Sequence, residues 1–166
     1  MSINQSFLAE FENEAASTRR LLERVPMDKW SWKPHEKSMS LGQLSFHVAE
    51  IVGWISDTLD NDTYDFAITP YVPKEEGTTE DLLKYYDDCV GKARTSIQNI
   101  SDENFMKTWT LRNGETVYLA MPKIQAMRGF CLNHLYHHRG QLTVYLRTLN
   151  VPLPSIYGPS ADENNM

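Results

Sequence analysis

Apolar residues recur at steps of three and four along four long stretches of the sequence, and this spacing constrains the fold more than any other feature. Such steps return to the same face of an α-helix, so each stretch predicts an amphipathic helix with one face turned to a core. The stretches are residues 3–25, 41–59, 79–100 and 122–150. They predict an all-α fold, a four-helix bundle. The connections are long, so a simple up-down-up-down order does not follow.

Three of these helices have recognisable start signals. Ser40 is followed three residues later by Gln43, the capping-box pattern in which each side chain bonds the backbone N–H of the other residue. Thr78 or Thr79 stands before two acidic residues, which favour the positive end of a helix. Pro122 suits the first turn of the last helix, where its missing N–H has no intrahelical partner to lose.

Strand-forming residues gather between the third and fourth stretches. Segment 108–118 is rich in Thr, Val and Tyr, and Asn113 with Gly114 is a strong tight-turn signal. A small hairpin near residues 108–118 is predicted, and it must lean on the helices because an isolated hairpin is marginally stable. Residues 1–166 are expected to form one domain, with residues 158–166 as a frayed tail.

Charge, hydropathy and cysteine content indicate which partners and which cellular compartment to expect. The chain has 22 acidic and 16 scattered basic residues, whereas nucleic-acid binding needs clustered cations, so no nucleic-acid partner is expected. The first residues lack a signal-peptide layout, and no apolar run reaches the roughly 20 residues of a membrane span. Cys89 and Cys131 form no CxxC pair, which favours a reducing compartment. We expect a soluble, cytoplasmic protein without a membrane partner.

Three of the five histidines fall in the segment NHLYHHRGQ of the fourth helix. His134 and His138 lie about 40° apart around the helix and one turn apart in height, a spacing that suits two ligands of one transition metal. His47 falls on the inward face of the second helix. Three imidazoles facing one apolar core need polar partners, and one divalent metal ion satisfies all three. The sequence therefore predicts a metal site of His47, His134 and His138.

Other readings of these residues stay open at this point. By spacing alone, the histidines are equally compatible with ordinary imidazoles bonded to backbone or carboxylate groups. His137 lies about 100° from His138, so we expect it at the rim of the site, and His35 is expected on a surface loop. Cys131 is either a soft fourth ligand or, as is more common, a small buried apolar side chain.

Three segments carry a family resemblance: KWSWKPHEKSMSLGQLSFHVAE, NHLYHHRGQLTVYLRTLNVPLP and PSIYGPS. Together they resemble the DinB-like (damage-inducible) superfamily, whose members are described as metalloenzymes. The resemblance implies a four-helix bundle, a histidine triad at the same three positions and, in many members, a homodimer. Relatives include thiol-dependent transferases and isomerases that use mycothiol, bacillithiol or glutathione.

The function hypotheses follow from the metal site and this resemblance. The first is a divalent-metal-dependent enzyme, such as a thiol-dependent S-transferase or isomerase, with a small-molecule substrate and a low-molecular-weight thiol as co-substrate. The alternatives are a metal-dependent hydrolase, with water as the nucleophile, and a non-catalytic metal- or small-molecule-binding dimer. Imidazole-rich sites suit zinc, nickel or iron, so the metal stays open, and no catalytic residue is assigned.

Several residues have a functional and a structural reading. Glu50, one turn beyond His47, is either an outer acceptor for that imidazole or a solvated acid. Arg139 points away from the histidine pair by helical angle, so a structural ion pair is favoured over a substrate contact. Tyr157, Trp30 and Trp32 either line the pocket mouth or, as is favoured, pack in the core.

Overall fold

The structure, a computed structural model, describes residues 2–75 and 77–164. Its long helical elements are α1 (Ile3–Leu22), α2 (Leu41–Asp60), α3 (Thr79–Asn99) and one continuous stretch made of α5 (Lys123–Ala126), the π-helical η2 (Met127–Leu132) and α6 (Asn133–Thr148). The short elements are the 3₁₀ turn η1 (Met27–Lys29), α4 (Asp102–Phe105) and the strands β1 (Thr63–Asp65), β2 (Thr108–Asn113) and β3 (Thr116–Pro122). The fold is mostly helical, with one small sheet.

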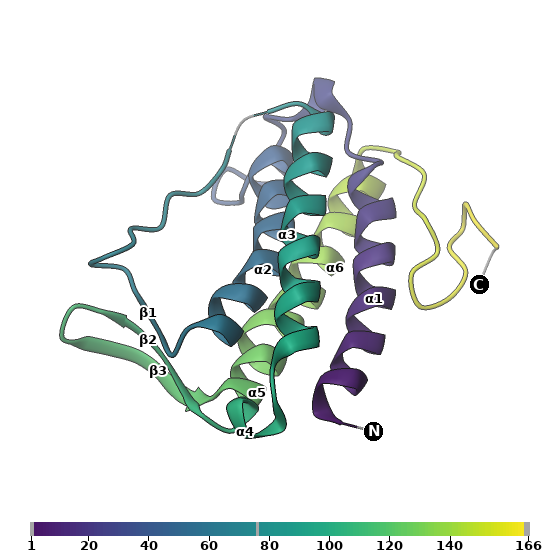
Figure 1. Cartoon of the computed structure of the whole chain (residues 1–166). Helices are drawn as coiled ribbons and strands as arrows, with labels where there is room; N and C mark the ends of the chain where they lie inside the picture. Colours follow the sequence, from purple (N-terminus) through teal and green to yellow (C-terminus); the bar gives the residue numbers. More distant parts are fainter. Residues whose placement is uncertain (1, 76, 165–166) are drawn as a thin grey trace.

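The long helices lie side by side in two opposite directions (Figure 1). Helices α1 and α6 run one way, and α2 and α3 run the other way. Helix α2 packs against both α3 and α6, and α1 packs against α3. Because α2 and α3 are parallel neighbours, the chain between them must return along the length of the helices. Residues 61–75 and 77–78 make this return on the outside of the molecule, which explains the long connection in the sequence.

The helix ends follow the local signals. Ser40 Oγ accepts from the N–H of Gln43 at 3.1 Å, and Gln43 Oε1 accepts from the N–H of Ser40 at 2.8 Å, which confirms the capping box. Thr78, rather than its neighbour, caps α3. Asn150 adopts a left-handed backbone with φ 58° just beyond α6, a conformation that Asn tolerates at a helix end.

The predicted hairpin is present, and it belongs to a slightly larger sheet. Strands β2 and β3 pair antiparallel, with Gly114 at φ 56° in the turn between them. Strand β1, which the sequence does not predict, pairs parallel with β2. Buried Lys123 joins the sheet to the end of α2, because its Nζ lies 2.9 Å from both the carbonyl of Leu59 and Oδ1 of Asp62.

Two groups of buried apolar residues hold these elements. The larger group lies among the helices, and the smaller one, around Trp109, Leu111 and Ala126, lies under the sheet. Phe130 packs against both, so it links the sheet to the helical core. Within residues 2–75 and 77–164, no helix combines the length and apolarity that a membrane crossing requires.

The C-terminal segment follows the surface beside α1 (Figure 1). The sequence leads us to expect fraying from residue 158. In the structure, Glu163 pairs with Arg24 at 2.6 Å and Asp162 pairs with Arg147 at 2.5 Å. These surface ion pairs tie the tail back to the helices as far as it is described, whereas residues 165–166 lie outside the described part.

A close approach at the start of α2 provides a test of the packing. A Cβ added at Gly42 would lie 2.1 Å from Nε1 of Trp30, whose indole also donates to the carbonyl of Glu75. We expect Gly42→Ala to lower the free energy of unfolding by about 1–3 kcal/mol, as overpacking does. Gly91→Ala is the matched control, because nothing lies within 4 Å of its added Cβ. That control should raise the stability by about 0.5–1 kcal/mol, since alanine is the better helix former. Urea titrations measure both, and an equal effect of the two changes would contradict the close packing.

Candidate metal centre

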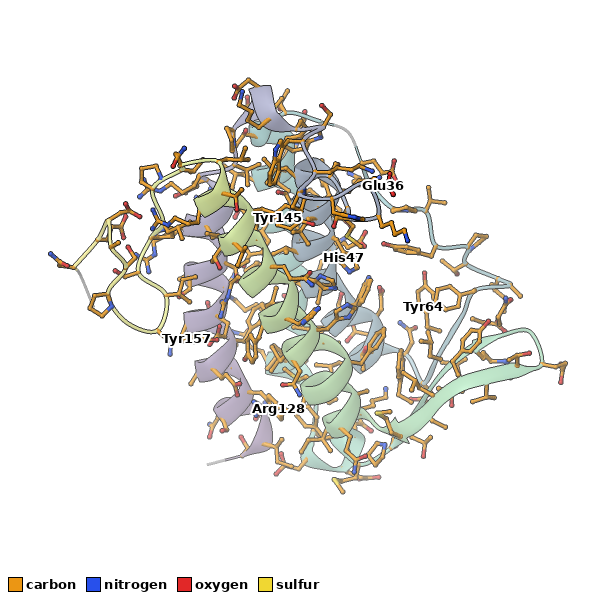
Figure 2. The ribbon with its side chains drawn as sticks, turned by 180° about the vertical axis from the view of Figure 1, so that it is seen from behind. Glu36, His47, Tyr64, Arg128, Tyr145 and Tyr157 are labelled. Atoms are coloured by element: carbon orange, nitrogen blue, oxygen red, sulfur yellow. The ribbon has the colours of Figure 1, made fainter. Side chains whose placement is uncertain are left out.

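The three predicted histidines meet between α2, which carries His47 (Figure 2), and α6, which carries His134 and His138. One ring nitrogen of each of His47, His134 and His138 lies within 4.8 Å of the corresponding nitrogens of the other two. The ring centroid of His47 lies 5.3 Å from that of His134 and 4.5 Å from that of His138. The expectation that these side chains point to one place is therefore met by the geometry.

Two imidazoles of the triad have an outer hydrogen-bond partner. His47 Nδ1 lies 2.7 Å from Oε1 of Glu50, and His138 Nδ1 lies 2.8 Å from Oε1 of Gln141. The backbone of Phe130 acts on His134 by opposing the lowering of its pKa. An acceptor oxygen at Nδ1 of His47 and of His138 favours the tautomer with its N–H there, which leaves a lone pair on Nε2 of the same ring. This is the arrangement that protein metal sites use to orient their histidine ligands.

The donor set fits a divalent ion closely. Three nitrogens no more than 4.8 Å apart share a point at most about 2.8 Å from each, whereas bonds from imidazole to zinc are about 2.0–2.1 Å. Small rotations of the imidazole rings would bring the three nitrogens from this distance to the length of a zinc–nitrogen bond. The ligands are neutral and borderline in softness, which suits zinc, nickel or iron, and a triad leaves further coordination positions open.

Burial keeps two of these imidazoles neutral. The pKa of His134 is lowered by desolvation and then by repulsion from His47. Desolvation likewise lowers the pKa of His138 to about 4, and this effect exceeds that of the opposing hydrogen bond to Gln141. His138 thus remains unprotonated, and able to donate to a metal, well below neutral pH, and burial shifts the pKa of His134 in the same direction.

The same shifts predict how pH changes the stability of the metal-free protein. The unfolded chain protonates His138 near pH 6.5 and the folded chain only near pH 4, so between these values the unfolded state binds more protons. Stability should therefore fall as the pH is lowered from 7 to 5. In chelator-treated protein, His138→Gln should lessen this fall in the urea midpoint, and His35→Gln, on an exposed loop, should leave it unchanged. An unaltered fall in His138→Gln would contradict the lowered pKa.

A π-helical turn precedes the second and third histidines. Segment η2 inserts a wider turn just before His134, and such turns are often found at functional sites. Cys131 within it is fully buried, with Sγ 3.6 Å from Oγ1 of Thr58, and burial raises its pKa to about 12. Among the described residues it does not join the candidate ligand group, so its reading as a small core residue holds and the fourth-ligand reading is not supported.

The remaining histidines lie outside the triad. His137 is exposed and stacks edge-on against His138, and the amide nitrogen of Gln141 lies 3.0 Å from its Nε2. Gln141 therefore bridges the two neighbouring rings. Sequence reasoning missed this role, although the signal was present: Gln141 follows His138 by three residues, as Glu50 follows His47. His35 is exposed on its loop, as expected.

Of the other residues singled out from the sequence, Glu50 contacts a candidate ligand of the metal and Arg139 has a structural role. Glu50 is the outer acceptor of His47, and its carboxylate also accepts from the hydroxyl of Tyr71. Arg139 is 2% exposed and forms a structural ion pair with Glu14 at 2.6 Å, which confirms the favoured reading.

None of the three aromatic residues proposed for the pocket mouth lines the cavity beside the triad. Trp30 packs on Phe46, Trp32 packs on Tyr145, and Tyr157 lies by Arg139 on the far side of α6 (Figure 2).

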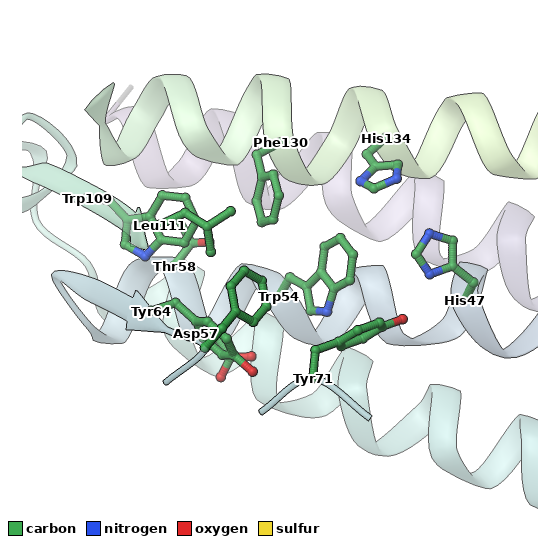
Figure 3. Close-up of a pocket in the computed structure, with 11 residues that line it drawn as sticks. His47, Trp54, Asp57, Thr58, Tyr64, Tyr71, Trp109, Leu111, Phe130 and His134 are labelled. Atoms are coloured by element: carbon green, nitrogen blue, oxygen red, sulfur yellow. The ribbon is translucent and has the colours of Figure 1, made fainter. Parts of the chain in front are cut away.

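A cavity of about 200 Å³ opens directly beside the triad (Figure 3). His47 and His134 form one end, and strand β2 forms the other. The walls are mainly aromatic and come from α2, the 61–78 connection, β2 and η2: Trp54, Tyr64, Phe66, Tyr71, Trp109 and Phe130. Sequence reasoning missed this set, because its members are spread over four segments that only the fold brings together.

Comparisons with known proteins agree with this fold. The Bacillus subtilis protein described as uncharacterized protein YrdA is 24% identical, over 95% of this chain and 89% of its own. The crystal structure of the DinB-like protein YjoA from B. subtilis superposes with a TM-score of 0.70 at 17% identity, covering 97% of this chain and 99% of that one. A DinB-like protein from Bacillus cereus gives the same TM-score at 18% identity, over 94% and 98%. The model of the DinB family matches residues 1–165, and the chain therefore belongs to the DinB family.

Proposed function

We propose that this protein is a metal-dependent enzyme that holds one divalent ion on His47, His134 and His138 and transfers a thiol to an apolar electrophile, as an S-transferase or an isomerase. The observation that supports the metal site is the set of three ring nitrogens within 4.8 Å of one another, together with the outer hydrogen-bond partners of His47 and His138. Zinc, nickel and iron are the candidate ions.

The chain and the ion have separate tasks in this proposal. When bound, the ion supplies Lewis acidity, which lowers the pKa of a thiol beside it. The three imidazoles hold the ion, while Glu50 and Gln141 fix the orientation of two of the rings. The aromatic walls of the adjoining cavity exclude water from the electrophile and hold it at the triad.

Two observations favour thiol transfer over hydrolysis. The cavity beside the triad is apolar, which suits an apolar electrophile. A hydrolase needs a general base at the attacking water, but Glu50 is engaged by both His47 and Tyr71. The other carboxylate on the cavity wall, Asp57, lies away from His47 toward β1 (Figure 3).

An activity screen on tag-free protein, loaded in turn with zinc, nickel and iron(II), tests the proposal. Glutathione, bacillithiol, mycothiol or cysteine is offered with 1-chloro-2,4-dinitrobenzene, so that a C–S bond forms, chloride leaves and the thiol proton passes to buffer. We expect product formation that requires both metal and thiol and is lost in His138→Ala. Thiol-independent cleavage of a nitrophenyl ester would instead support the hydrolase. Full metal occupancy without either reaction would support a non-catalytic binding protein.

The outer partner of His47 gives a prediction about affinity. Glu50→Ala removes the acceptor at 2.7 Å from Nδ1 and should weaken metal binding about 10–100-fold, the usual cost of losing such a partner. Glu50→Gln retains an acceptor oxygen and should recover part of the loss. Competition with a chromogenic chelator measures the affinity, and Glu80→Ala, an exposed acid on α3, is the control. Equal affinity in the wild-type and Glu50→Ala proteins would show that Glu50 does not orient the ring.

We also infer that the four long helical stretches form the four-helix bundle expected from the sequence, since α2 packs on both α3 and α6 and α1 packs on α3. A homodimer in the cytoplasm completes the proposal. The support for the dimer is the family resemblance, and the support for the compartment is that Cys89 and Cys131 are both free. Light scattering on purified protein tests the dimer.

A further inference from the structure

A second cavity, of about 190 Å³, reaches the triad at His47. His47 and Tyr71 line both this cavity and the apolar one, and they stand at the same end of the apolar cavity (Figure 3). Along α2, the apolar cavity begins at Trp54, whereas the second cavity takes Gln43 and Glu50, which lie nearer the start of the helix. The two cavities therefore extend from His47 in opposite directions along α2.

The walls of the second cavity favour a cationic occupant. Glu50, Lys74 and Glu75 contribute the charged side chains. The ammonium of Lys74 lies 4.2 Å from the ring centroid of Tyr85, which is not among the described residues that line the cavity. Its positive charge is thus already placed over an aromatic face. Two carboxylates remain, and they attract a cation and repel an anion.

Glu50 offers this cavity a buried acceptor. The residue is only 5% exposed, and its Oε1 lies 2.7 Å from Nδ1 of His47 and accepts from the hydroxyl of Tyr71. Among residues 2–75 and 77–164, no hydrogen bond is made to Oε2, yet the one sealed and unpaired side-chain atom there is Nε1 of Trp109. Oε2 is therefore accessible, and Glu50 lines the second cavity but not the apolar one.

A ligand that meets both Glu50 and the triad must be short. Only the imidazole of His47 separates them, because Glu50 contacts Nδ1 and the lone pair on Nε2 is left for the ion. An ammonium two carbon atoms away from a sulfur spans such a gap. The volume agrees, since a cavity of about 150 Å³ in another protein holds benzene, so about 190 Å³ takes roughly six to eight non-hydrogen atoms.

We propose that the second cavity binds the ammonium group of a small aminothiol, in which two carbons separate the amine from the sulfur. The ammonium donates to Oε2 of Glu50, and the sulfur is directed at the triad. A cysteinyl group with a free amine has this arrangement. The inference rests on the proposed function for the role of the sulfur, and it deepens that function by assigning thiol and electrophile to separate cavities on either side of His47.

The ammonium site is tested without metal. 2-(Methylthio)ethylammonium and 2-(methylthio)ethanol share a chain and differ only in the group that meets Glu50. Each is titrated into ¹⁵N-labelled, chelator-treated protein in about 0.15 M salt, which screens the net surface charge, and the backbone amide signals of Gln43 and Glu50 are followed by NMR. We expect the ammonium probe to move these signals saturably and to bind about tenfold more tightly than the alcohol, as a charge-assisted hydrogen bond does.

A matched pair of variants assigns this preference to one carboxylate. Glu50→Gln keeps the size of the side chain and removes its charge, so the ratio of the two dissociation constants should fall to near unity. Glu80→Gln, an exposed acid on α3, should leave the ratio unchanged. The inference is overturned if the wild-type protein binds both probes equally, or if the preference survives in Glu50→Gln. The wild-type comparison needs no variant, so it decides even where Glu50→Gln does not fold.

Nickel-loaded protein tests the position of the sulfur. Cysteamine and 2-mercaptoethanol are titrated, and thiolate-to-nickel absorption measures their binding. We expect cysteamine to bind more tightly in the wild-type protein and to lose this advantage in Glu50→Gln. An amine that bound nickel directly would keep the advantage in that variant and would contradict the proposal. If metal is not taken up but the metal-free protein prefers the ammonium probe, the proposed function fails and the ammonium site stands. If metal is bound without that preference, this inference alone fails.

Discussion

His134→Ala is expected to purify without stoichiometric metal, whereas the wild-type protein is expected to bind one divalent ion per chain. Removing one of three nitrogens leaves two ligands on different helices, and the loss of affinity should exceed the roughly 10–100-fold that an outer partner costs. Helix content should persist, because a domain of this size buries enough apolar surface to fold without the ion. Elemental analysis and circular dichroism measure the two quantities on protein prepared without a nickel column, which would load nickel regardless of function.

His137→Ala is the matched control for this experiment. It lies on the same helix, is exposed and is not one of the three converging ligands. It should retain the full metal content. Equal metal in His134→Ala and His137→Ala would refute the triad, and equal loss in both would point to an unspecific effect on α6.

Arg139→Met is expected to cause the largest loss of stability, about 3–5 kcal/mol. The guanidinium is buried at 2% exposure and pairs with Glu14, which is itself only 10% exposed at its side chain. It also donates to Oγ1 of Thr18 at 3.0 Å and to the hydroxyl of Tyr157, which in turn donates to Glu14 at 2.9 Å. Methionine fills much of the volume but leaves the Glu14 carboxylate without its cation in a poorly hydrated position.

Two comparisons isolate this cause, with urea unfolding as the measurement. Arg94→Met removes an exposed pair with Glu12, where both side chains are about 40% exposed, and should cost about 0–1 kcal/mol. The double change Arg139→Met with Glu14→Gln should recover much of the loss, because the unpaired charge is gone. A small effect of Arg139→Met alone would show that solvent reaches Glu14 and that the network is not needed for stability.

The helices and the triad could be predicted because their signals are local. The capping pair Ser40 and Gln43 and the turn at Gly114 involve neighbours in the chain, and the structure confirms both. His134 and His138 are brought together by the helix repeat itself. The direction of Arg139, away from the triad, followed from the same repeat.

Strand β1 and the π-helical turn were not predicted, for a common reason. Three residues, Thr63–Asp65, carry too little pattern to identify a strand, and they are ordered by pairing with β2 some 45 positions later. The turn η2 was not predicted either, since residues 127–132 continue the apolar spacing of an ordinary helix; within it Phe130 packs against both cores. The partners of Arg139 could not be predicted either, because Glu14 and Tyr157 come from the two ends of the chain.

The sequence by itself determined the mostly helical class, the helix ends and three histidines with the spacing of a metal site, because these depend on the helix repeat and on contacts between near neighbours. Only the tertiary structure decided which rings gather beside that site. The cavity beside the triad is lined by the 61–78 connection, by α2, by β2 and by η2, and Trp54, Trp109 and Phe130 meet there from segments far apart in the chain. Such a cavity arises from packing between distant segments, and no local periodicity records it.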